Sequence, residues 1–90
     1  MYYAADRETA KRALADLRVA RGSEKAATLA SLQRLRNAVA SERTDDLARI
    51  HAWVAIRKLY DACKADDAGD LKPLWQDAIS RTSAWHDSLR

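Results

Sequence analysis

The chain has 90 residues, a length that fits one domain better than two, and it carries a net charge of +3. Hydrophobic residues make up 48% and charged residues 32%, a balance typical of folded chains that excludes a disordered one. No apolar run approaches the length of a transmembrane helix, and one cysteine excludes an internal disulfide.

The composition predicts an all-α fold in a single helical domain spanning residues 1–90. Ala and Leu dominate the chain, while it holds two Gly and one Pro. Ala, Leu, Arg, Lys and Gln all favour helices, and the β-branched and aromatic residues that favour strands are few. A small β protein would also need more glycine and proline for its turns.

The periodicity of apolar residues predicts four helices, over about residues 4–21, 24–42, 45–65 and 71–89. Breakers and capping residues mark the ends of these segments. The expected N-caps and closing residues are Asp6, Gly22, Ser23, Thr44, Gly69 and Asp70, with Pro73 in the first turn of the last helix.

Short connections between these segments predict an antiparallel up-down four-helix bundle, because that arrangement buries all four amphipathic stripes. The junction near Thr44 contains neither Gly nor Pro. An alternative is therefore a three-helix chain with one long helix over residues 24–65, which would have to dimerise to cover its apolar face.

The third predicted helix has an unusually wide apolar arc, more than a surface helix needs. One interpretation makes it the most buried element of the bundle. The other leaves part of the arc outside as a surface for a partner protein, because Trp, Tyr and Arg dominate interface energetics. The candidate partner-binding residues are Trp53, Tyr60, Ile56, Arg49 and Arg57.

Other large or reactive residues fit the core better than a site. Trp75 and Trp85 are in phase with the aliphatic stripe of the last helix, so we expect core anchors with indole N–H groups near the bundle edge. Cys63 falls on the apolar arc of the third helix, where a small core residue is expected.

No pattern in the chain indicates catalysis, a metal or a cofactor. His51 and His86 each lack a second His three or four residues away, and no cysteine pair, phosphate loop or nucleophile elbow occurs. We therefore expect a protein that is not an enzyme and holds neither metal nor cofactor.

The basic residues are concentrated in the first half of the chain. Residues 1–43 hold nine Lys and Arg against five Asp and Glu. A basic face on the first hairpin could neutralise phosphates. The candidate contacts to nucleic acid, or to an acidic partner, are Lys11, Arg18, Arg21, Lys25, Arg34 and Arg36.

Together these features predict a small non-enzymatic protein–protein interaction module. Small chains rich in Ala and Arg are common among phage and mobile-element products, and by that analogy we expect an inhibitor or adaptor of a host protein complex. The alternatives are a nucleic-acid-binding module and a homodimeric scaffold. The N-terminal segment has no secretory pattern, so a cytoplasmic location without membrane association is expected.

Overall fold

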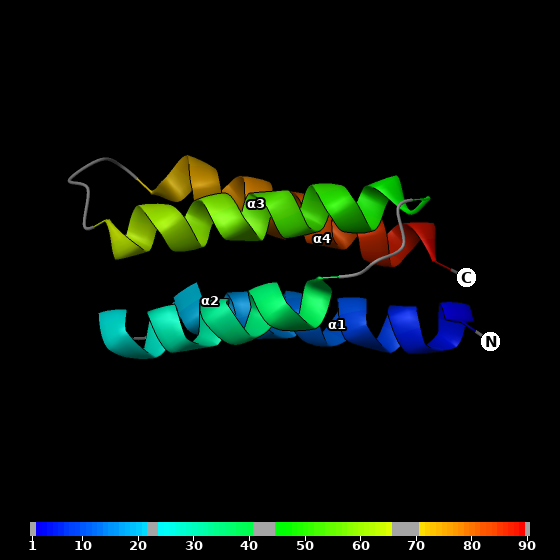
Figure 1. Ribbon diagram of the computed structural model, residues 1–90, viewed down its shortest axis with the longest axis horizontal. Coiled ribbons are helices and arrows are strands. Elements are labelled where there is room, and N and C mark those ends of the chain that lie inside the picture. Colours follow the sequence, from blue (N-terminus) through cyan, green and yellow to red (C-terminus); the bar gives the residue numbers. More distant parts are fainter. Residues whose placement is uncertain (1, 22–23, 41–44, 66–70, 90) are drawn as a thin grey trace.

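The computed structural model describes residues 2–21, 24–40, 45–65 and 71–89, with side chains from residue 6 onward. These residues form four α-helices, namely α1 (Tyr2–Arg21), α2 (Lys25–Val39), α3 (Leu47–Lys64) and α4 (Lys72–Ser88). Consecutive helices pack together and α1 also packs against α4, which closes a square (Figure 1). The predicted up-down four-helix bundle is confirmed.

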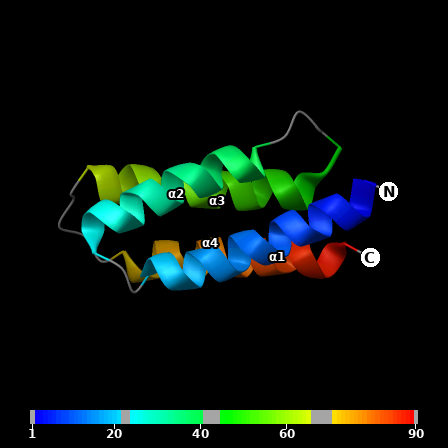
Figure 2. The same cartoon turned by 90° about the horizontal axis from the view of Figure 1, so that it is seen from below.

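The bundle is elongated, with extents of 41 × 20 × 19 Å. Helices α2 and α3 lie along one long side, and α1 and α4 lie along the opposite side (Figure 2). The first and last described residues meet at the same end of the bundle. These two faces are called the α2–α3 side and the α1–α4 side below.

The alternative of one helix over residues 24–65 is wrong. Helix α2 ends at Val39, and Ala40 leaves the helical region with φ −56° and ψ 136°. Helix α3 begins at Leu47 and packs back against α2. Because α3 packs against α2 in the same chain, the apolar stripe of α2 is covered without a second chain.

The structure corrects the predicted N-caps. Asp6 is not an N-cap, since α1 begins at Tyr2, and it is a buried residue in the second turn. Asp46, in place of the predicted Thr44, is the N-cap of α3 and accepts a 3.2 Å hydrogen bond from the Arg49 amide. Pro73 lies in the first turn of α4 as predicted. The N-caps of α2 and α4 are Glu24 and Leu71, in place of the predicted Ser23 and Asp70. The predicted caps Gly22, Ser23, Thr44, Gly69 and Asp70 themselves lie outside the described residues.

A buried threonine links the end of α1 to the beginning of α2. The Thr28 hydroxyl donates a 2.9 Å hydrogen bond to the carbonyl oxygen of Ala20. The last carbonyl groups of a helix have no partner within it, so a donor from the next helix stabilises that end. This bond fixes the α1–α2 corner from inside the bundle.

The core is built from small residues on α1 and larger ones on the other three helices. Helix α1 buries Ala10, Ala13, Leu17 and Ala20, which allows its neighbours to approach closely. Trp75 and Trp85 are both buried, as predicted for core anchors. The expectation for the Trp85 indole is wrong, however, because its Nε1 atom is buried and has no hydrogen-bond partner among the described residues. Cys63 is a buried core residue, as predicted.

None of the described helices is long and apolar enough to span a bilayer.

Candidate functional site

The apolar arc of α3 is divided between the core and the surface. Its buried residues are Ala52, Ala55, Ile56, Leu59 and Cys63. At the opposite edge, Leu47 is 63% exposed and Val54 is 37% exposed. Trp53 and Tyr60 lie between these extremes, partly buried and packed against the core from its rim. The bundle therefore covers only part of the arc.

Ile56, predicted to contact a partner, is a core residue instead. Its exposed fraction is 0%, so it offers no surface to another molecule in this fold. The physical reason is its position on the helix, because it lies between Ala52 and Leu59 on the side of α3 that faces the bundle axis. Ile56 is therefore removed from the candidate site.

Arg49, also predicted to contact a partner, makes its interactions inside the protein. Its Nη1 lies 2.6 Å from Asp6 Oδ1 on α1, and the two side chains are only 11% and 12% exposed. Its Nε donates a 2.8 Å hydrogen bond to the Val39 carbonyl, and Nη2 lies 3.4 Å from the carbonyl oxygens of Ala38 and Ala40 at the end of α2. The guanidinium also stacks over the Trp85 ring at 5.1 Å. One side chain of α3 thus contacts all three other helices.

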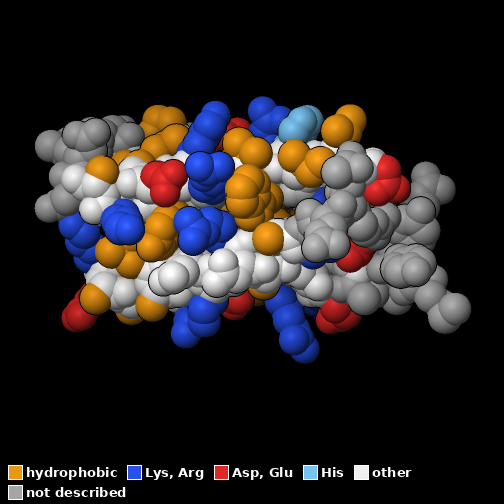
Figure 3. Space-filling view, viewed as in Figure 1, with side chains coloured by type: hydrophobic (Ala, Val, Ile, Leu, Met, Phe, Trp, Pro, Cys, Tyr) orange, Lys and Arg blue, Asp and Glu red, His pale blue; other side chains and the backbone are white. Residues whose placement is uncertain are grey.

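The remaining predicted residues form a cluster on the α2–α3 side. Trp53 Nε1 donates a 3.1 Å hydrogen bond to the Arg36 carbonyl. The Arg57 guanidinium lies 5.5 Å from the centre of the Trp53 ring, and that of Arg36 lies 4.9 Å from the centre of the Tyr60 ring. We call Arg36, Trp53, Arg57 and Tyr60 the aromatic–arginine cluster. Hydrophobic and basic side chains alternate on this face in Figure 3.

The arginines of the cluster are held by their aromatic partners and remain accessible. A guanidinium over an aromatic face is attracted by the ring and keeps N–H groups free at its edge. Arg57 is 56% exposed, and its carboxylate partner Asp61 is 3.9 Å away and 59% exposed, so that ion pair is weak. No carboxylate of the described residues pairs with Arg36.

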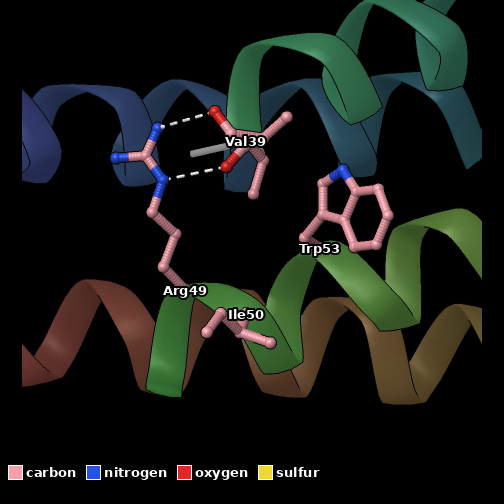
Figure 4. Close-up of a pocket in the computed structure, with 5 residues that line it drawn as sticks. Val39, Arg49, Ile50 and Trp53 are labelled. Atoms are coloured by element: carbon pink, nitrogen blue, oxygen red, sulfur yellow. Dashed lines mark hydrogen bonds between the residues drawn. The ribbon is translucent and has the colours of Figure 1, made fainter. Parts of the chain in front are cut away.

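A cavity of about 250 Å³ opens beside the cluster, where the end of α2 faces the beginning of α3. Among the described residues, its lining is mainly apolar and comprises Val39, Ala40, Arg49, Ile50 and Trp53. Figure 4 shows the Arg49 side chain reaching across to the α2 carbonyls at one end and the Trp53 indole standing at the other. The buried arginine therefore fixes one wall of an apolar hollow on the surface.

The structure divides the six basic residues predicted to contact nucleic acid between different sides of the bundle. Arg34 and Arg36 are about 160° apart around α2 at 3.6 residues per turn. Lys25 and Arg36 are on the α2–α3 side, since Lys25 interacts with Cys63 and Arg36 with Tyr60. Arg21 lines a hollow with α4 on the opposite side, and the helical period places Lys11 and Arg18 with it. The six do not form one continuous face.

The described residues contain no group of three or more His, Cys, Asp or Glu side chains that could hold a metal ion. Burial raises the pKa of the Cys63 thiol above its ordinary value of 9.0, and the nearby Lys25 charge offsets part of that effect. A thiol of this kind is protonated at neutral pH and is a poor nucleophile.

The chain matches no family model, no curated protein and no solved structure.

Replacing Arg49 by Ala should destabilise the protein by about 3–5 kcal/mol, because it breaks the ion pair with the buried Asp6 and removes the donors to the end of α2. Urea denaturation followed by circular dichroism measures the loss. Arg57→Ala is the matched control, with an expected change within about 0.5 kcal/mol for an exposed side chain. Equal losses in the two variants would contradict the role given to Arg49.

The Cys63 thiol should titrate above pH 9.0 in the folded protein. The unfolded chain then releases this proton at a lower pH than the folded one, so the group's contribution lowers the free energy of unfolding as pH rises through its ordinary pKa. Thiolate absorbance near 240 nm, taken as the difference between the wild type and Cys63→Ala, measures the midpoint without the tyrosine contribution. A midpoint at or below 9.0 would refute burial as the dominant influence.

Proposed function

We propose that this protein is a non-enzymatic binding module that docks a partner protein on its α2–α3 side. The observation that carries the proposal is the aromatic–arginine cluster beside an apolar cavity. Trp, Tyr and Arg dominate the energetics of protein interfaces, and here they occur together at the surface. Both rings are partly anchored in the core, so little conformational entropy is lost when they meet a partner.

The rigid support of the cluster strengthens this proposal. Trp53 is held by its hydrogen bond to the Arg36 carbonyl, and the cavity wall is held by Arg49. Interfaces need a preorganised anchor surrounded by groups that exclude water. An inhibitor or adaptor of a host protein complex, acting in the cytoplasm, is the role that such a small module would serve.

The test compares proteins captured from the cell that encodes this chain by the wild type and by two double variants. Arg36→Glu with Arg57→Glu reverses both charges of the cluster. Arg12→Glu with Arg34→Glu makes the same charge change at exposed positions outside it. We expect the partner to be recovered with the wild type and the control, and at least about tenfold less with the cluster variant.

The melting temperatures of both double variants should stay close to that of the wild type, because all four arginines are on the surface or at its edge. A cluster variant that captures the same proteins as the wild type would overturn the proposal, and so would a control that loses them equally.

A row of basic residues on α1 supports a second candidate function, nucleic-acid binding on the α1–α4 side. Arg7, Lys11, Arg18 and Arg21 are exposed and follow one another at helical spacing over about 21 Å. Arg7 and Lys11 line a hollow with His86 of α4, and Arg21 lines another with α4 residues. Phosphates could bind along this row.

If this row binds nucleic acid through four phosphate contacts, affinity for a DNA duplex should fall about a hundredfold between 50 and 200 mM salt. Fluorescence anisotropy with a labelled duplex measures it. Lys11→Glu with Arg18→Glu should abolish binding, whereas the control pair Arg12→Glu with Arg34→Glu should weaken it less. Absence of binding at 50 mM salt would rule out this second function.

A further inference from the structure

We infer that the partner of the α2–α3 side is an acidic polypeptide segment carrying one large apolar side chain, which enters the cavity while its carboxylates meet Arg36 and Arg57. This inference rests on the proposed function and names the chemistry of the partner. Three observations carry it, namely the size of the cavity, the sign of the charges around it and the occupation of the aromatic faces.

The cavity matches one side chain better than a small-molecule ligand. Its volume of about 250 Å³ lies below the range of about 300–1,000 Å³ that is usual for ligand sites. Ile50 and Trp53 form its α3 side, and Val39 and Ala40 form its α2 side. An aliphatic or aromatic side chain buried here loses its hydration without leaving a polar group unpaired.

The positive charges beside the cavity favour an acidic segment. Arg57 lies one turn beyond Trp53 on α3, and its guanidinium reaches back over that ring. Arg36 comes from the neighbouring helix α2 and lies above Tyr60. Stacked guanidinium groups keep their N–H edges for carboxylates, which they can bind through two parallel hydrogen bonds. Carboxylates about one and two turns from the apolar anchor would meet Arg57 and Arg36.

The same stacking argues against single-stranded nucleic acid as the occupant. Proteins that hold single strands stack bases on free aromatic faces. Here one face of each ring is covered by a guanidinium, and both rings pack against the core from its rim. The indole Nε1 of Trp53 is also engaged with the Arg36 carbonyl, so little aromatic surface is left for a base.

A second copy of the chain is also a poor occupant. In a two-fold symmetric dimer the same patch meets itself. Arg36 of one copy would then face Arg36 or Arg57 of the other, and like charges brought together at an interface oppose association. An acidic segment of a different protein offers the opposite charge and the apolar anchor together.

The test is selection of binders to the wild-type protein from a displayed library of random 12-residue peptides. We expect the enriched peptides to contain at least two Asp or Glu residues near one Leu, Ile, Met, Phe or Trp. In heteronuclear NMR, a synthetic peptide of this kind should shift the Trp53 indole signal and the amides of Ala40, Ile50 and Arg57.

Two matched variants make the test specific. Arg36→Gln with Arg57→Gln should weaken the selected peptide at least about tenfold, and Arg12→Gln with Arg34→Gln should leave its affinity within about twofold. Replacing the peptide's apolar anchor by Ala should also weaken binding. Enrichment of neutral or basic peptides, enrichment of none, or equal binding by the cluster variant would overturn the inference.

The peptide experiment and the capture experiment can fail independently, so their results distinguish the inferred partner chemistry from the proposed docking face. If the charge-reversed cluster variant loses its cellular partner while acidic peptides fail to bind, the docking face stands and the inferred partner chemistry is wrong. If the cluster variant keeps its partner and the selected peptides shift signals elsewhere on the bundle, both are wrong.

Discussion

The arrangement of the bundle depends on the interactions of one largely buried group, the guanidinium of Arg49. It pairs with Asp6 of α1, donates to the terminal carbonyls of α2 and stacks over Trp85 of α4. Carbonyl groups at a helix end have no partner inside the helix and carry partial negative charge, so a cation there is favourable. Thr28 serves the end of α1 in a similar way, through one neutral hydrogen bond to Ala20.

The candidate site is a direct consequence of this arrangement. Because Arg49 holds the end of α2 against the first turns of α3, the two helices enclose an apolar hollow beside Trp53. Three arginines lie over aromatic rings, and they differ in how far their side chains are exposed to solvent. Arg49 is enclosed and its donors are used within the protein, whereas Arg36 and Arg57 lie at the surface with donors available to a partner.

The sequence predicted the helices because their apolar periodicity and breakers are local signals. It also gave Trp53, Tyr60 and Arg57 as candidates, since an arc too wide for one buried face can be recognised on a single helix. It did not predict the pairing of Arg49 with Asp6, which joins residues 43 positions apart and depends on how α1 packs near α3. Arg36 was grouped with the basic residues of the first hairpin, because its stacking on Tyr60 requires the register between α2 and α3.

A double-mutant cycle between Asp6 and Arg49 tests most directly whether this guanidinium joins the helices. The free energies of unfolding of Asp6→Asn, Arg49→Gln and the double variant are compared with that of the wild type. A coupling free energy of about 1–3 kcal/mol is predicted for a pair buried to this extent. Changes that add within about 0.3 kcal/mol would show that the two side chains do not act together, and would contradict this account.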